Sequence, residues 1–305
     1  IKEPEKKTPP SLLERLLGRS GGFDKEENKT VIAHEMTHAL ADQNFDLDKL
    51  DEAAKGDDDR VLALQALIEG EATLAMMGAS MEDWDGKETV KLPGEAMGRS
   101  FAMIAPFLSM TGGPQLRQAP SILIESLTFP YLQGLVFTAS LTNKGGWEAV
   151  NEAYRKPPLS TEQILHPEKY LAKPDAPTKL DPGRLPLGPD WKEVYRNVMG
   201  EMAIGVLLRR QGGKSSAEGW DGDTYIVCEN PRGQVGLAWI TTWDSEAEAS
   251  RFARALERYH RLKLKQPAPP PKGKELSAPR VRLESGDTLL VLERRGLDVA
   301  LVEGF

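Results

Sequence analysis

The chain has 305 residues, of which 40% are apolar and 28% are charged, a composition that is typical of globular proteins and disfavours disordered and fibrous classes. This length predicts two domains of ordinary size. The net charge of -7 comes from 46 acidic and 39 basic side chains without a dense Lys/Arg block, so a nucleic-acid partner, which needs a phosphate-neutralising surface, is not expected.

The longest apolar stretches predict no membrane-spanning segment. They lie at 101–108 and 204–208, far short of the ~20 residues that a bilayer requires. A single cysteine, Cys228, cannot form an intrachain disulfide and leaves the redox compartment open. The first residue is Ile1, which is compatible with removal of an export signal and thus with a secreted or periplasmic location. No sequence feature indicates an oligomeric state.

The first two thirds of the chain predict helices. Residues 1–22 are rich in Lys, Glu, Pro and Gly and predict a flexible arm. Helical spacing of apolar residues without Gly or Pro predicts a helix at 25–45, and the same spacing returns at about 60–80. Pro106 and Pro130 are expected to kink or end the helices that contain them. Further helices are predicted at 95–110, 119–142, 147–154 and 191–210.

The remainder predicts an α+β organisation. Residues 157–189 contain eight prolines and should be irregular, apart from a helix-capping turn at Ser160. Beyond residue 219 the apolar pattern changes to that of strands. Strands at 225–227 and 235–243 predict a hairpin, and Ser245 is expected to cap a helix that runs to about residue 262. Three short strands are predicted at 281–283, 288–293 and 299–302. The fold class is therefore α+β, with a mainly helical domain at 23–212 and a small α+β domain at 213–305.

One short motif carries a metal-binding pattern. The sequence His34-Glu35-Met36-Thr37-His38 places two imidazoles four residues apart, on one face of the predicted helix. A catalytic zinc needs three protein ligands and an open position for a water molecule, whose pKa it lowers to about 7. Glu35 stands beside the imidazoles as a carboxylate that could take the proton. The motif alone is equally compatible with two surface histidines on an amphipathic helix.

A third ligand is available on the next predicted helix, in Ile68-Glu69-Gly70-Glu71-Ala72. On these two segments the chain resembles the gluzincins, the thermolysin-like and aminopeptidase-like zinc peptidases in which a Glu of the following helix completes the site. The resemblance covers about 25–170. It implies a zincin-like catalytic domain, Zn²⁺ as cofactor, and Glu69 rather than Glu71 as the third ligand.

The chain departs from the thermolysin-like pattern around the third ligand. Ile68 stands in place of an Asn, and Thr73 in place of an Asp that orients a ligand histidine. Asp42, one turn beyond His38, is a candidate replacement that could accept an imidazole N–H. Three stretches also resemble uncharacterised bacterial proteins, namely 34–47, 157–170 and 242–247.

Peptide hydrolysis passes through an oxyanion, which a zincin usually stabilises with a His or Tyr donor. His166, in the Pro-rich segment, is the first candidate. Tyr154 and Tyr170 flank the same region and are alternatives, against the simpler interpretation of a loop histidine and of packed tyrosines with solvated hydroxyls.

Other polar residues are expected to have no special role. His260 lies near the end of a predicted helix and should be solvated. The acidic runs 57–59 and 221–223 lack the ligand spacing of an EF-hand and predict charged turns. Cys228 lies in an apolar strand and predicts a core residue, whereas Glu71 is expected to face solvent.

The leading hypothesis is zinc-dependent hydrolysis of peptide bonds in a peptide or protein substrate. His34, His38 and Glu69 would hold the metal, and Glu35 would act as the general base. The alternative is a non-catalytic, metallopeptidase-like scaffold or binding protein that acts through residues 213–305. The presence of Glu35 argues against this alternative, because a closed structural zinc site leaves no water to deprotonate.

Overall fold

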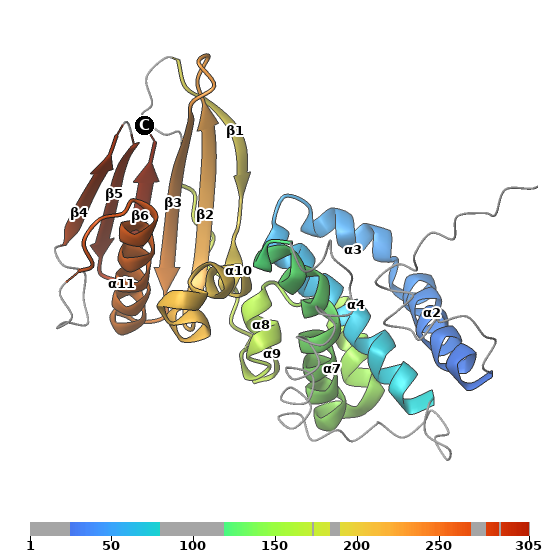
Figure 1. Cartoon of the computed structure of the whole chain (residues 1–305). Coiled ribbons are helices and arrows are strands. Elements are labelled where there is room, and N and C mark those ends of the chain that lie inside the picture. Colours follow the sequence, from blue (N-terminus) through green and yellow to red (C-terminus); the bar gives the residue numbers. More distant parts are fainter. Residues whose placement is uncertain are drawn as a thin grey trace, which may run out of the picture. The chain divides into compact units, whose positions relative to one another are not determined.

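The computed structural model describes residues 25–79, 119–172, 174–183, 190–269, 279–286 and 288–304 (Figure 1). The predicted arm at 1–22 and the predicted helix at 95–110 lie outside these residues. The chain forms two compact units, the first made of Ile1–Leu50 and Gln65–Pro157, the second of Asp51–Leu64 and Pro158–Phe305. The boundary thus falls earlier than the predicted one at 212, because Ile204 and Leu208 belong to the core of the second unit.

Helices build the first unit, as the sequence predicts. Helix α2 spans Lys25–Phe45 and α4 spans Asp58–Ala79, close to the predicted bounds. Between them, α3 occupies Leu47–Ala54. The Asp57 carboxylate accepts a hydrogen bond of 3.0 Å from the backbone N–H of Arg60 and thereby caps the start of α4.

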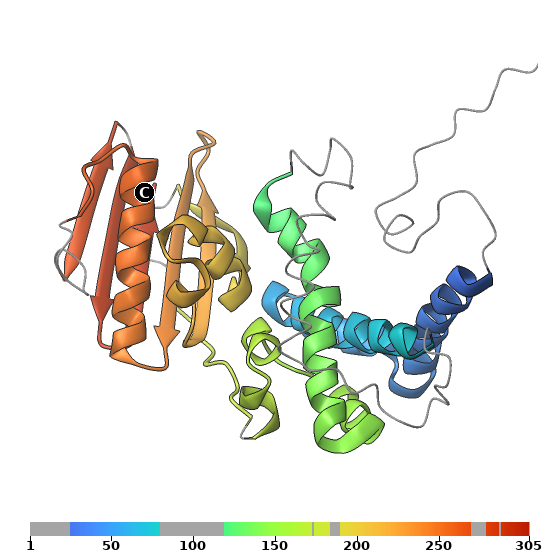
Figure 2. The ribbon, with the colours of Figure 1, turned by 60° about the horizontal axis from the view of Figure 1, so that its bottom comes forward.

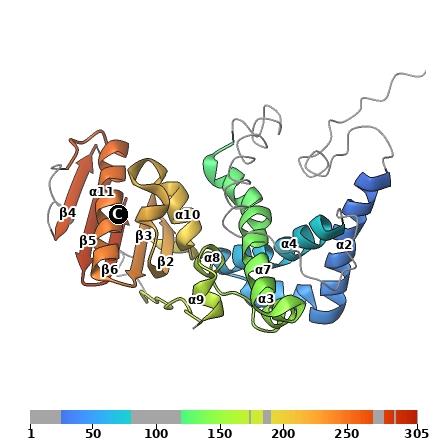
Figure 3. The ribbon, with the colours of Figure 1, turned by 90° about the horizontal axis from the view of Figure 1, so that it is seen from below.

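Helix α7 (Ser121–Arg155) crosses α4 at a contact between two glycines (Figure 3). A Cβ atom on Gly70 would collide with the carbonyl of Gly134, and a Cβ on Gly134 would collide with the carbonyl of Ala66. The two backbones therefore touch at a position that only glycine permits. Fully buried side chains of the two helices surround this contact, namely Leu67, Leu74, Leu135, Phe137 and Leu141.

Helix α7 also corrects one prediction about proline. The predicted break between 142 and 147 is confirmed, because Gly145 and Gly146 leave the helical conformation, the second with φ 65°. Of the two outcomes predicted for Pro130, a kink or an end, the end does not occur, since the helix continues through it. Pro130 and its neighbour Phe129 are both buried, so packing offsets the amide donor that proline lacks.

The second unit is built on a six-stranded antiparallel sheet of order β1-β2-β3-β6-β5-β4. Its strands are β1 (Lys192–Asn197), β2 (Trp220–Glu229), β3 (Val235–Trp243), β4 (Arg280–Ser285), β5 (Thr288–Arg295) and β6 (Asp298–Glu303). The predicted hairpin and the three predicted C-terminal strands are confirmed. The unit also holds helices α8 (Thr161–Leu165), α9 (Glu168–Leu171), α10 (Gly200–Leu207) and α11 (Glu246–Lys263).

Helices α10 and α11 cover one face of this sheet (Figure 2). The core between them and the strands contains Trp243 stacked on Phe252, with ring centroids 4.4 Å apart. The predicted caps are confirmed at both Ser160 and Ser245, whose hydroxyls accept hydrogen bonds from backbone N–H groups in the first turns of α8 and α11.

The helix predicted at 191–210 is wrong in its first half, where β1 pairs with β2. Helix α10 begins only at Gly200, which has φ 74°. The buried carboxylate of Asp223 holds this start by accepting hydrogen bonds of 2.9 Å from the backbone N–H groups of Met199 and Gly200. The partner strand and the capping carboxylate both come from distant sequence, which a local pattern does not reveal.

Helices α4 and α7 are long and apolar enough to cross a membrane by length and composition alone. Core helices of soluble proteins meet the same criterion, and half of the apolar window of α4 is buried inside the structure. The absence of a membrane-spanning segment therefore stays a prediction.

Candidate metal centre

Two imidazoles and one carboxylate converge in the first unit. The Nε2 atoms of His34 and His38 lie 3.0 Å apart. One Glu69 carboxylate oxygen, Oε2, lies 3.3 Å from Nε2 of His34 and 3.5 Å from Nε2 of His38. Ligand atoms around a tetrahedral zinc with bonds of ~2.0–2.1 Å are separated by roughly 3.3 Å. The three atoms are therefore spaced as ligands of one small cation.

The Glu69 oxygen at the centre of this cluster is an orphaned polar atom. It is buried, and no residue in the described part of the chain gives it a hydrogen bond of good geometry. Burial opposes ionisation of Glu69, but the adjacent imidazoles outweigh it and lower the pKa of this carboxyl to about 2. A buried carboxylate oxygen without a partner is costly, so the donor set fits a divalent metal ion that would satisfy it.

Glu35 lies beside this cluster on α2 and is exposed. Its charge, after that of Glu69, contributes to the raised pKa of His38. The Glu35 carboxylate thus lies near the imidazoles but is not one of the three clustered ligand groups. Such a group is free to exchange protons with a substrate and with solvent.

Tyr131 is a residue of this centre that the sequence did not reveal. Its ring stacks near His34, with centroids 6.5 Å apart and an interplanar angle of 17°. Burial and the nearby Glu69 carboxylate raise the pKa of Tyr131 to about 12, so its hydroxyl keeps its proton. Tyr131 precedes Gly134 by nearly one helical turn. Only the crossing of α7 over α4 brings it to Glu69.

Tyr154, a predicted oxyanion donor, uses its hydroxyl in another way. The hydroxyl donates a hydrogen bond of 2.6 Å to the Glu71 carboxylate, and its ring stacks on Phe45 with centroids 4.6 Å apart. The expectation that Glu71 faces solvent is wrong. Burial raises the pKa of this half-buried carboxyl, although the bond from Tyr154 partly opposes the shift.

The ring of His34 has no orienting carboxylate among the residues that the structure describes. Nδ1 of His34 is buried, and no side chain or backbone group in the described ranges forms a hydrogen bond with it. Asp42 was the candidate for this role. Its carboxylate instead accepts a hydrogen bond of 3.1 Å from the backbone N–H of Leu47, at the start of α3.

His166 lies in the second unit, directly after α8, and pairs there with Glu201. Its Nε2 atom is 3.0 Å from a Glu201 carboxylate oxygen, and this contact raises the pKa of His166. His166 and Tyr170, the other tyrosine alternative, are therefore not among the residues that the first unit gathers around Glu69. The role of His166 as an oxyanion donor stays a prediction.

A second polar cluster in the second unit is centred on Lys169. Its amine lies 2.6 Å from Glu162, 2.5 Å from Asp244 and 3.2 Å from Asp175. The segments 157–170 and 242–247 meet at this lysine. The positive charge beside these three carboxylates is therefore supplied by a side chain of the protein.

Three further expectations are corrected or confirmed by burial. His260 is 4% exposed rather than solvated, and burial lowers its pKa to about 4. Asp59 and Asp223 are buried instead of forming exposed charged turns, since Asp59 accepts hydrogen bonds from Thr161, and Asp223 caps α10. The prediction that Cys228 is a core residue is confirmed.

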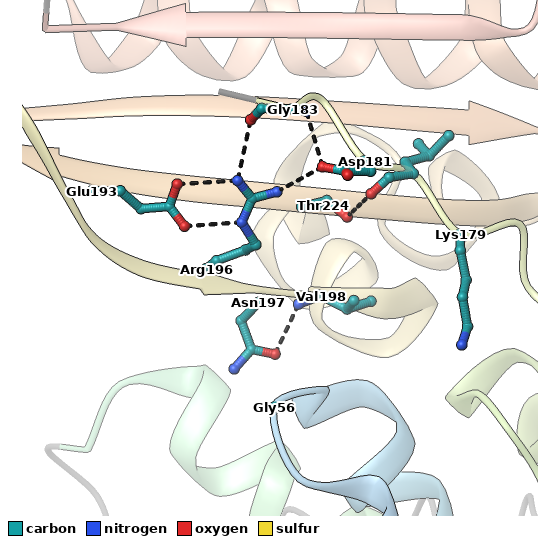
Figure 4. A pocket seen from close by; sticks show the side chains of 10 residues that line it. Gly56, Lys179, Asp181, Gly183, Glu193, Arg196, Asn197, Val198 and Thr224 are labelled. Atoms are coloured by element: carbon teal, nitrogen blue, oxygen red, sulfur yellow. Dashed lines mark hydrogen bonds and ion pairs between the residues drawn. The ribbon is translucent and has the colours of Figure 1, made fainter. Parts of the chain in front are cut away.

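The second unit also has a cavity of about 730 Å³ beside β1 (Figure 4). The guanidinium of Arg196 lies at its wall and donates hydrogen bonds to both oxygens of Glu193, to Asp181 and to the carbonyl of Gly183. The hydroxyl of Thr224 donates to the carbonyl of Leu180. These groups satisfy one another, so the cavity indicates no particular ligand.

A family described as a domain of unknown function (DUF8575) matches residues 187–305. The match covers the sheet of the second unit, less than half of the chain, and includes none of the residues around Glu69. No curated protein and no solved structure matches the chain. The matched family therefore gives no information on the candidate metal centre.

Proposed function

We propose that the chain is a zinc-dependent hydrolase of peptide bonds, with His34, His38 and Glu69 as the metal ligands. The observation that carries this proposal is the triangle of three ligand atoms, 3.0–3.5 Å on each side. One corner is the buried Glu69 oxygen, which has no hydrogen bond with any residue that the structure describes. Two imidazoles and a carboxylate suit Zn²⁺ and leave a fourth position for a water molecule. The ligands come from α2 and α4, as the gluzincin resemblance implies.

The side chains around the cluster supply the acid–base chemistry. When bound, a zinc ion would acidify water and polarise the substrate carbonyl. Glu35 takes the proton of the attacking water and returns it to the leaving amine. Tyr131 keeps its proton and donates a hydrogen bond to the oxyanion that develops on the carbonyl. It joins His166 as a candidate for that role and lies in the unit that contains the ligands.

The test compares the wild-type chain with Glu35→Gln. We expect about one zinc per chain by elemental analysis in both proteins, and cleavage of a mixed-peptide library by the wild type. Loss of the general base should slow cleavage by roughly 10²- to 10⁴-fold without loss of zinc.

Two outcomes would contradict the proposal. Glu35→Gln that cleaves at the wild-type rate would exclude the mechanism. Bound zinc without any cleavage by the wild type would favour the alternative, a scaffold that acts through residues 213–305.

A further inference from the structure

Three helices meet near the candidate metal centre, and one side chain touches two of them from the third. The hydroxyl of Tyr154 on α7 donates a hydrogen bond of 2.6 Å to the Glu71 carboxylate on α4. Its ring stacks on Phe45, the last residue of α2. The side chain is only 2% exposed. Tyr154 therefore joins the helix that carries both histidines to the helix that carries Glu69.

The break of α7 at Gly145 and Gly146 lets the segment that carries Tyr154 turn back to Glu71, next to the point where Gly134 of the same helix touches Gly70. Gly70 separates the two glutamates of α4, and without a side chain there α7 approaches the backbone of α4 directly. Tyr131 then lies near Glu69, and Tyr154 binds Glu71. The hydrogen bond to Glu71 is short and involves a charged acceptor, the strongest kind between side chains.

We propose that Tyr154 is a positioning residue of the metal centre, which fixes the separation of α2 and α4 at which the three ligand atoms converge. This inference rests on the proposed function. Phe45 follows His38 by seven residues, or roughly 10 Å of helix. A small change in the angle of α2 at Phe45 is therefore transmitted to the imidazoles, and ligands must be held within about 0.5 Å. Tyr154 acts through Glu71 and Phe45 and needs no contact with the metal or the substrate.

The experiment uses the full chain with Tyr154→Phe, which removes the hydroxyl and keeps the ring on Phe45. Zinc affinity is measured by competition with a chromophoric chelator, and the visible spectrum of the Co²⁺-loaded protein reports the ligand geometry. We expect zinc affinity to fall about tenfold, the typical lower effect of removing a side chain that orients ligands. We also expect a changed Co²⁺ spectrum, with KM for a cleaved peptide unaltered.

Two further variants make the result decisive. Tyr259→Phe, on α11 of the second unit, is the matched control and should bind zinc as the wild type does. Glu71→Gln removes the charge that accepts the bond, so combining it with Tyr154→Phe should weaken zinc binding by less than the product of the two single effects. Glu71→Gln alone decides the outcome if Tyr154→Phe does not fold.

The failures of the two proposals are distinguishable. A wild-type chain that binds no zinc refutes the proposed function, and the positioning role falls with it. A wild-type chain that binds zinc, with Tyr154→Phe and Glu71→Gln of unchanged affinity and Co²⁺ spectrum, overturns the positioning role alone.

Discussion

Two polar clusters, one in each unit, differ in how their acidic groups are neutralised. In the second unit, Glu162, Asp175 and Asp244 surround the amine of Lys169, so the acidic groups and their cation both belong to the chain. In the first unit, a Glu69 oxygen is buried beside two imidazoles and has no hydrogen bond with any residue that the structure describes. Acidic side chains alone therefore do not indicate a metal site, whereas an unsatisfied buried carboxylate oxygen beside imidazoles favours one.

The largest effect is expected from removing the built-in cation with Lys169→Met. Glu162, which is 1% exposed, would lose its partner, and breaking such a pair costs about 3–5 kcal/mol of unfolding free energy. Urea unfolding followed by tryptophan fluorescence measures it. Lys263→Met, whose pair with Glu303 is half exposed, should cost less than about 1 kcal/mol. Equal effects of the two variants would show that the Lys169 cluster is not a structural core.

A smaller effect is expected from adding zinc, the ion proposed for the first unit. Zinc at about 100 times its dissociation constant should stabilise the folded chain by about 2.7 kcal/mol, because it binds only the folded state. The gain should vanish in His38→Ala and persist in Lys169→Met, as measured by thermal unfolding with zinc or with a chelator. Zinc stabilisation that survives His38→Ala would place the ion elsewhere.

The smallest effect concerns His260, a buried imidazole of the second unit. Burial lowers the pKa of His260 to about 4 in the folded chain, against about 6.5 when unfolded. Between these values the unfolded state binds the extra proton, so stability falls as pH decreases from about 6.5 towards 4. The loss should reach about 2 kcal/mol at pH 5.

Urea unfolding at pH 7.5 and pH 5 tests this prediction. His260→Gln removes the titrating ring, so its unfolding free energy should depend less on pH over this range. An unchanged pH dependence in the variant would mean that His260 titrates normally.

Local sequence determined the elements on which the candidate site is built. Helical spacing and the absence of Gly and Pro define α2 from Lys25 to Phe45, and four-residue spacing puts His34 and His38 on one face of it. The expectation that Glu69 is a metal ligand stays a prediction, and the structure places its carboxylate 3.3 Å from Nε2 of His34. Ser245 identified the start of α11, because a cap bonds to a neighbour three residues away.

Tertiary structure alone decided which polar groups meet. Tyr131 reaches Glu69 because Gly70 and Gly134 let α4 and α7 touch, across more than sixty residues of sequence. Tyr154 reaches Glu71 because α7 breaks at Gly145 and Gly146 and its last segment turns back to α4. Strand β1 likewise depends on distant sequence, since its partner strand lies some thirty residues away. The local pattern of 191–210 therefore predicts a helix where the structure has a strand. Helix spacing and caps depend on bonds within one turn and can be read from sequence. Burial and hydrogen-bond partners depend on which distant segments pack together.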